Sequence, residues 1–212
     1  MSPSLRRAWL DGAWVRNRRV VGEGEPSEPS EVLWLQAGPW FADLRVAKSA
    51  AVSAHALDHS QAFSGRLDMM HHSGNDVVVT WHHDLDTVER GARGDDTASL
   101  SQCDGEMVES GEGYVEWWRR ADEPYGARAF VLEHEACDAA GHVIDARIVR
   151  VGGVAIAVWS GQTRGGFSST EHARWEPERE VGELPRRVDV VGALHAAVDE
   201  RVLTDRWRWR EV

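Results

Sequence analysis

The sequence of 212 residues predicts an all-β protein, an antiparallel β-barrel with one helix near the C-terminus. About ten to twelve short segments have strand-like patterns, and turn residues separate them at hairpin spacing. Helical periodicity is confined to residues 190–203, so the helices that a βαβ fold needs between its strands are missing. The sequence contains neither a Gly-x-Gly-x-x-Gly segment nor a P-loop, which excludes the familiar nucleotide-binding motifs.

The first half of the chain reads as short strands joined by turns. An Asp-Gly pair at 11–12 lies between the apolar runs 8–10 and 13–15, which is the signature of a two-residue hairpin turn. Residues 77–85 carry the strongest strand signal because they begin with a run of β-branched residues. The other segments expected here are strands at 31–36, 40–46 and 62–67, a surface loop at 22–30, a helical turn or loop at 49–57, and a polar connection at 90–102.

The second half continues with hairpins and then changes pattern. A Gly-Gly pair between Val151 and Val154 predicts a second two-residue turn. Residues 190–203 place Ala193, Leu194 and Ala197 on one face, which predicts an amphipathic helix. The remaining strands are expected at 106–109, 114–119, 127–135, 142–151, 154–159 and 207–210.

Composition and charge restrict the classes of function. Hydrophobic residues make up 42% of the chain and charged residues 28%, so the chain can bury a core and is not disordered. The formal charge of −11 argues against binding to nucleic acid, which needs a basic face, and against docking on anionic lipid. The two cysteines are far apart, and we find no signal peptide and no apolar run that could span a bilayer. We therefore expect a cytoplasmic protein with free thiols.

Short motifs follow one another along the chain: WFADLR at 40–45, AFSG at 62–65, TW at 80–81, DGEMVESG at 104–111, YVEWWR at 114–119 and VAIAVWSG at 154–161. Together they resemble the Hri-type family, a fungal family of lipocalin-like proteins with bacterial relatives. The resemblance spans nearly the whole chain and implies one lipocalin-like domain over residues 1–212, as a single barrel or as two packed barrel halves. It transfers no catalytic signature and no cofactor. The fungal member is associated with a protein kinase and with secretory machinery, but no kinase-docking motif is recognisable here.

Strand alternation along residues 40–46 separates the aliphatic side chains from a polar face, which carries Phe41, Asp43 and Arg45. In one interpretation the aliphatic face is core, and Asp43 with Arg45 forms a solvated ion pair that contributes well under about 1 kcal/mol. In the other, the polar face lines a barrel, where a guanidinium held by a carboxylate grips an anionic ligand. The sequence leaves both interpretations open.

The same alternation along residues 77–86 puts Trp81, His83 and Leu85 on the apolar face and His82 with Asp84 on the polar one. His83 would then point into a barrel beside Trp81, either as a hydrogen-bonded core histidine or as a proton-transfer group. His82 and Asp84 could form a histidine–carboxylate pair, or they could simply be part of an exposed polar face.

Tyr114, Glu116 and Trp118 share one face of the strand expected at 114–119. These side chains suit a cavity wall that holds a planar ligand and hydrogen-bonds its edge, although cross-strand pairs on an exposed sheet explain them equally well. We expect most of the eleven tryptophans to be core, with Trp34 and Trp81 as further wall residues.

Metal and covalent chemistry have little support in the sequence. The ten histidines are scattered without the spacing of a zinc site, and there is no Gly-x-Ser-x-Gly nucleophile elbow. We therefore expect no metal site. The cofactor stays unknown, because a haem held by one buried histidine leaves no sequence signature.

Three hypotheses of function follow. The first is a cytoplasmic barrel that binds a small-molecule ligand, partly apolar and anionic, through Arg45, Trp34, Trp81, Tyr114 and Trp118. The second is an enzyme on the same barrel that performs an acid–base isomerisation, cyclisation or elimination through His83, Glu116 and Asp43. The third is an interaction module whose acidic surface meets a basic protein partner. None of them involves nucleic acid or a membrane.

Overall fold

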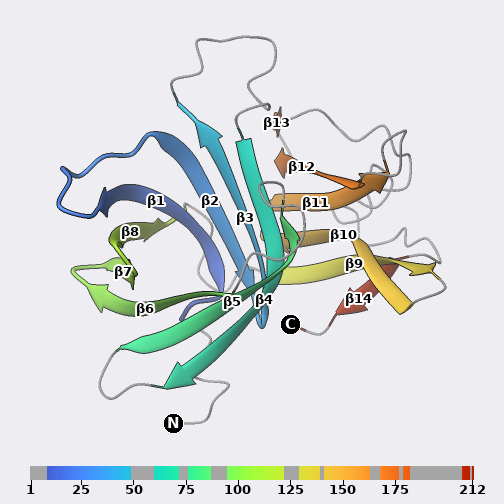
Figure 1. The fold of residues 1–212 in the computed structure, drawn as a ribbon, viewed down its shortest axis with the longest axis horizontal. Helices are drawn as coiled ribbons and strands as arrows, with labels where there is room; N and C mark the ends of the chain where they lie inside the picture. Colours follow the sequence, from blue (N-terminus) through green and yellow to red (C-terminus); the bar gives the residue numbers. More distant parts are fainter. Residues whose placement is uncertain are drawn as a thin grey trace.

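A computed structural model describes residues 9–48, 60–71, 76–86, 95–121, 129–138, 141–162, 168–176, 179–181, 207–210 and 212. The described residues form an eight-stranded closed barrel and a six-stranded sheet that packs against one side of it (Figure 1). The all-β prediction is confirmed, and no helix occurs among the described residues. The helix expected at 190–203 and the helical turn or loop expected at 49–57 lie outside them.

The barrel is built from consecutive antiparallel strands, and the pairing of the first with the last closes it. Closure pairs every strand on both sides and leaves no edge open to other chains. The strands are β1 (Gly12–Val21), β2 (Ser30–Ala37), β3 (Trp40–Ala47), β4 (Ser60–His71), β5 (Val77–Asp86), β6 (Asp96–Cys103), β7 (Glu106–Gly111) and β8 (Tyr114–Arg120).

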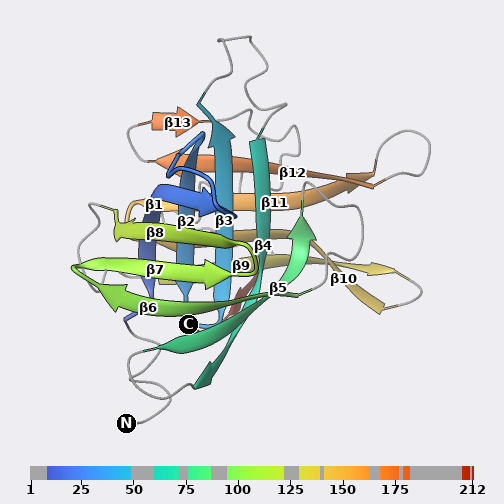
Figure 2. The ribbon, with the colours of Figure 1, turned by 60° about the vertical axis from the view of Figure 1, so that its left-hand side comes forward.

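The second sheet has the strand order β13-β12-β11-β10-β9-β14. Figure 2 shows β6, β7 and β8 on the side of the barrel that faces away from this sheet. Its strands are β9 (Ala129–Asp138), β10 (Gly141–Val151), β11 (Val154–Gln162), β12 (Ser168–Glu176), β13 (Arg179–Val181) and β14 (Trp207–Arg210).

Glycines form the tight turns at which several predicted hairpins are confirmed. Val151 pairs with Val154 across the Gly-Gly turn, where Gly152 has a φ of 57°. Ala37 pairs with Trp40 in the same way, with Gly38 at a φ of 55°. A positive φ costs glycine little because it lacks a Cβ, so these turns follow directly from the sequence.

Two local predictions were wrong. The Asp-Gly pair at 11–12 is not a hairpin turn, because residues 9–10 form a turn and β1 begins at Gly12. Asp11 instead accepts a hydrogen bond from the Gly38 backbone N–H at 2.9 Å. The polar connection expected at 90–102 contains β6, in which only Ala98 and Leu100 are buried and polar residues occupy the outer positions. The sequence pattern did not indicate this strand because its apolar face contains so few residues.

Two apolar cores lie on opposite sides of the barrel wall. The inner core lies inside the barrel and includes Trp14, Trp34, Phe41, Leu67, Trp81 and Trp118. The outer core lies between the barrel and the second sheet, and it joins Leu33, Leu44 and Leu85 to Val131, Val149 and Ile156. Because this outer core is shared, the barrel and the sheet bury one another's apolar faces.

A buried ion cluster also joins the second sheet to the barrel. Arg147 in β10 donates from Nε to Glu133 in β9 at 2.9 Å and from Nη2 to Asp84 in β5 at 2.7 Å. The guanidinium carbon of Arg147 lies 4.7 Å from the centre of the Trp40 ring. The planar guanidinium meets two carboxylates and an aromatic face at once, which the point charge of lysine does not do.

Replacing Arg147 with Met removes this guanidinium from the buried Glu133, and we expect the free energy of unfolding to fall by about 3–5 kcal/mol. Chemical denaturation followed by tryptophan fluorescence measures the change. Arg150→Met is the matched control, because Arg150 lies on the same strand but stacks on Phe130 and donates to the Gly152 carbonyl. Equal losses in the two variants would contradict a special role for the cluster.

Candidate functional site

A cavity of about 190 Å³ lies in the barrel lumen. All eight residues singled out from the sequence line it, namely Trp34, Asp43, Arg45, Trp81, His83, Tyr114, Glu116 and Trp118. Its other lining residues are Arg19, Phe41, Phe63, Asp96 and Glu109. Every strand of the barrel contributes at least one of these side chains, so the cavity depends on the closure of the whole wall.

The polar face of β3 points into the lumen. Phe41, Asp43 and Arg45 line the cavity, whereas Ala42 and Leu44 belong to the outer core. The side chains therefore lie as in the second interpretation of this segment, in which its polar face lines the inside of a barrel. Arg45 Nε donates to Asp43 Oδ1 at 2.9 Å, and the guanidinium stacks on Phe63 at 4.7 Å. Burial by itself would lower the pKa of Arg45, but the charge of Asp43, the hydrogen bond to it and the charges of Glu116 and Glu109 together outweigh burial and raise the pKa.

Two arginines of β1 lie on its inner side, Arg16 before a β-bulge and Arg19 after it. Arg16 pairs with Trp118 and Arg18 with Trp117, which leaves Asn17 as an extra residue. Arg19 consequently lines the cavity, while Arg18 stays outside and stacks on Trp117 at 4.6 Å. Strict alternation would have placed Arg18 with Arg16 and turned Arg19 away. The sequence contains no signal for this bulge, and sequence reasoning missed both inner arginines.

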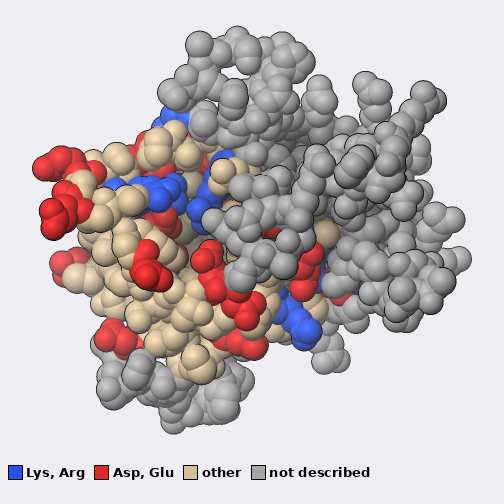
Figure 3. Space-filling view, viewed as in Figure 1, with Lys and Arg blue, Asp and Glu red and all other residues tan. Residues whose placement is uncertain are grey.

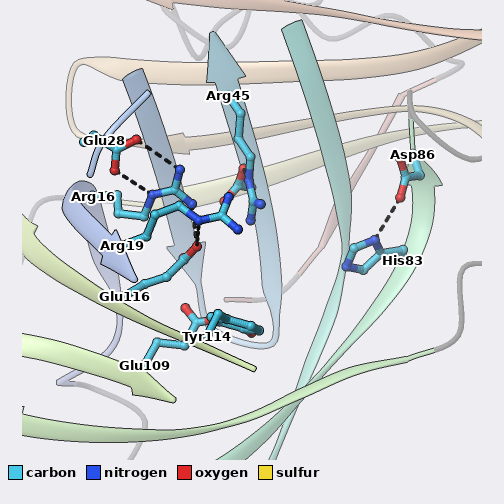
Figure 4. Close-up of polar contacts among 10 residues, drawn as sticks. Arg16, Arg19, Glu28, Arg45, His83, Asp86, Glu109, Tyr114 and Glu116 are labelled. Carbon is cyan, nitrogen blue, oxygen red and sulfur yellow. Dashed lines mark hydrogen bonds and ion pairs between the residues drawn. The ribbon is translucent and has the colours of Figure 1, made fainter. Parts of the chain in front are cut away.

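Arg16 lies at the centre of a buried hydrogen-bonded chain (Figure 4). Its Nε and Nη2 donate to the two carboxylate oxygens of Glu28 at 2.7 and 3.1 Å, and its Nη1 donates to Glu116 at 2.6 Å. Arg19 reaches the same Glu116 oxygen at 3.9 Å. Burial raises the pKa of Glu116, and the charge of Arg16 offsets this only in part.

Glu109 lies directly opposite Glu116 as its cross-strand partner in β7 and β8. Tyr114 Oη donates to Glu109 Oε1 at 2.8 Å, and the tyrosine ring lies close over Gly111, where a Cβ would come within 2.2 Å of it. Burial, together with the charge of Glu116, raises the pKa of Glu109 to about 8. Glu109 is therefore largely protonated at neutral pH. Burial and the adjacent Glu109 likewise raise the pKa of Tyr114.

His83 enters the lumen at a second bulge. Ser64 pairs with Leu85 and Gly65 with His83, so Asp84 is the extra residue in β5. The bulge turns Leu85 into the outer core, which corrects the expectation that Leu85 shares a face with His83. It also brings Asp86 to His83, with Nδ1 and Oδ2 3.1 Å apart, while the imidazole stacks on Phe63 at 4.7 Å.

Gly65 is required at this bulge because a Cβ there would lie 1.7 Å from the His82 carbonyl oxygen. Of the two interpretations of His82 and Asp84, the histidine–carboxylate pair does not form, and His82 lies on an exposed polar face. His82 lies on the outer surface between Asp95 and Asp68, at 2.7 and 3.1 Å. The hydrogen bond to Asp95 is the main cause that raises the pKa of His82.

Three tryptophans, Trp34, Trp81 and Trp118, form an apolar part of the cavity wall. The Trp34 ring meets Trp81 and Trp118 edge-on at 5.8 and 5.6 Å between ring centres. Trp34 Nε1 donates to Gln36 at 3.1 Å, which fixes its orientation. Trp118 Nε1 and Arg19 Nε are buried, and neither has a hydrogen-bond partner among the residues that the structure describes. Buried donors of this kind are rare in proteins and indicate where a ligand or water accepts a hydrogen bond.

The described residues contain no group of three or more histidine, cysteine, aspartate or glutamate side chains placed to hold a metal ion. Within the same residues, no helix has the length and hydropathy needed to cross a bilayer. On the face seen in Figure 1, acidic side chains cover a larger part of the described surface than lysine and arginine do (Figure 3).

The fold and the lumen define a β-barrel protein with an internal polar cavity. The chain matches the family model described as Protein HRI1 over residues 14–211, and it belongs to that family. It is also similar to a crystal structure of an uncharacterised protein from Saccharomyces cerevisiae, with 16% identity and a TM-score of 0.60. That match covers 84% of this chain and 89% of the yeast chain. Among curated protein sequences, none matches.

The raised pKa of Glu109 predicts a pH dependence of stability. Between 4.5, the ordinary pKa of a glutamate, and about 8, the folded protein keeps a proton that the unfolded chain has lost. Stability therefore decreases as pH rises through this interval, and above it the full destabilisation remains but no longer changes with pH. We expect Glu109→Gln to remove most of the decrease and to raise the melting temperature by several degrees at about pH 8.5.

Thermal unfolding from about pH 5 to about pH 9 measures this dependence. Glu112→Gln is the matched control, because Glu112 lies exposed in the adjoining turn. Parallel pH profiles for Glu109→Gln and the parent protein would contradict the assignment of a buried, protonated carboxyl.

Proposed function

We propose that the protein binds a small, partly apolar anion, in particular a carboxylate, in the barrel lumen. One observation carries the proposal: the guanidiniums of Arg19 and Arg45 line the cavity, and both have N–H groups for which the described residues provide no hydrogen-bond partner. Arg45 donates to Asp43 through Nε, and no other hydrogen bond of its guanidinium is found within the described residues. A guanidinium fork with two adjacent N–H groups matches the two oxygens of a carboxylate.

The size of the cavity supports a small ligand. Pockets for drug-sized molecules measure about 300–1,000 Å³, and this cavity of about 190 Å³ is smaller. Phe41, Phe63 and the three tryptophans supply the apolar surface that such sites use for affinity. The ligand would therefore place its apolar part among the rings and its charged group at the arginines.

The cost of building the site supports a functional role for it. Burying an ion pair in a barrel costs desolvation energy that a hydrophobic pair of similar volume would avoid. Asp43 and Glu116 are both nearly fully buried, at 4% and 3% exposed, beside cations that bond to them. A purely structural barrel would be expected to fill these positions with aliphatic side chains.

Acid–base catalysis in the same cavity is a second candidate function. It is favoured by the pair of Glu109 and Glu116, in which one carboxyl is kept protonated beside the other. Neighbouring carboxyls in different protonation states can act as the acid and the base of one reaction. His83, Glu116 and Asp43 are the proton-transfer groups in this proposal, with Glu109 added as the acid. A bell-shaped pH–rate profile that survives both His83→Gln and Glu116→Gln would remove it.

Arg45→Met and Arg19→Met are each expected to weaken binding of a small carboxylate by about ten- to a hundredfold, the loss of one charged hydrogen-bonding group. Ligand-observed NMR on mixtures of small carboxylates, followed by titration of each hit, measures the effect. Arg18→Met is the matched control, because Arg18 adjoins Arg19 in sequence but stacks outside the barrel on Trp117. The proposal fails if no carboxylate binds, or if Arg18→Met weakens binding as much as the other two.

A further inference from the structure

The lumen contains more acidic groups than an anionic ligand alone would favour. Four carboxyl side chains line the cavity, those of Asp43, Asp96, Glu109 and Glu116, against the two guanidiniums of Arg19 and Arg45. Asp43 is bonded to Arg45, and Glu116 to Arg16. Within the described residues, Glu109 forms no ion pair, and its hydrogen-bond partner is the Tyr114 hydroxyl.

The charged groups are arranged in two poles. Figure 4 shows Arg16, Arg19 and Arg45 on one side of Glu116, with Glu109 and Tyr114 on the other. The cationic pole comes from β1 and β3, and the acidic pole from β6, β7 and β8, where Asp96 also lines the cavity. A simple carboxylate would satisfy the first pole and leave the second without a partner of opposite charge.

A cationic group of the ligand at the acidic pole would balance the excess of carboxyl groups over guanidiniums in the cavity lining. An ammonium next to Glu109 would supply the positive charge that this carboxyl lacks, and the Tyr114 hydroxyl oxygen would remain beside it as an acceptor. The indole rings of Trp34, Trp81 and Trp118 line the same cavity, and aromatic faces attract ammonium groups. The acidic pole is therefore suited to an amine rather than to a second anion.

We infer that the lumen recognises a small zwitterion, an amino-acid-like molecule with an apolar side chain. Arg19 and Arg45 hold its carboxylate, Glu109 and Asp96 hold its ammonium, and the aromatic rings enclose its side chain. This inference rests on the proposed function, because it adds a second charged group to the ligand that the function requires.

The protonation of Glu109 supports this assignment. Burial and the charge of Glu116 raise its pKa to about 8, with Tyr114, Arg45 and Asp43 as the other groups that act on it. An ammonium bound beside it favours the carboxylate form, so Glu109 loses its proton as the ligand binds. Binding at neutral pH then releases a proton to the buffer, which a carboxylate bound at the arginines alone would not cause.

Three probes of nearly equal shape separate the two poles: L-leucine, 4-methylpentanoate, which lacks the amine, and 3-methylbutylamine, which lacks the carboxylate. Isothermal titration calorimetry on the full-length protein, in two buffers of different ionisation enthalpy, gives the affinity and the protons released. We expect leucine to bind at least tenfold more tightly than either fragment and to release a proton at neutral pH.

Variants assign each charged group of the ligand to its pole. Glu109→Gln should weaken the binding of leucine at least tenfold more than the binding of 4-methylpentanoate. It should also abolish the release of a proton on leucine binding. Arg45→Met should weaken the binding of leucine at least tenfold more than the binding of 3-methylbutylamine. Glu112→Gln and Arg18→Met are the matched controls, since both residues lie outside the cavity. Should Glu109→Gln fail to fold, Tyr114→Phe and the proton release of the parent protein still test the acidic pole.

The outcomes distinguish the two proposals. If 4-methylpentanoate binds as tightly as leucine, or if leucine binds without releasing a proton, the zwitterion inference is overturned and carboxylate binding stands. If 3-methylbutylamine binds as tightly as leucine and Arg45→Met has no effect, the carboxylate site is overturned as well. Absence of binding by all three probes at millimolar concentration overturns both.

Discussion

The constraint on which the rest of the structure depends is that charges enclosed by a barrel must be compensated inside it. Water does not solvate Arg16, which is 3% exposed, so Glu28 and Glu116 must surround its guanidinium. These contacts join β1 to β8 at the closure of the barrel and to the segment that leads into β2. The ion chain that shapes the lumen therefore also holds the wall closed.

Two bulges decide which charges take part. The extra residue Asn17 brings Arg19 into the lumen, and the extra residue Asp84 separates His83 from Leu85 and brings Asp86 to the imidazole. At the second bulge Arg147 bonds to Asp84 from the neighbouring sheet, so the second sheet supports the wall at the point where His83 enters the cavity. Bulges commonly re-aim side chains next to functional sites.

Much of this arrangement follows from period-2 alternation, and the exceptions have physical causes. Alternation correctly placed Asp43 beside Arg45 and Glu116 beside Trp118, because β3 and β8 run without a bulge through those residues. It failed at Arg19 and Leu85, because a single inserted residue reverses the face of everything beyond it. Glu109 fell within a predicted strand, but its role depends on the register with Glu116, which one sequence does not specify.

The outer core has a consequence for how the barrel folds. Residues 32–37 of β2 are buried on both faces, since one face meets the lumen and the other meets the second sheet. When one face of a strand is exposed to solvent, the alternation of polar and apolar side chains fixes its register, because a shift by one residue would expose the apolar side chains. Exposure of apolar side chains does not penalise a shifted register along residues 32–37, so the volumes of the side chains must select the register. The large indole of Trp34 lies in the inner core, Leu33 and Leu35 lie in the outer core, and the tight turn at Gly38 fixes the end of the strand.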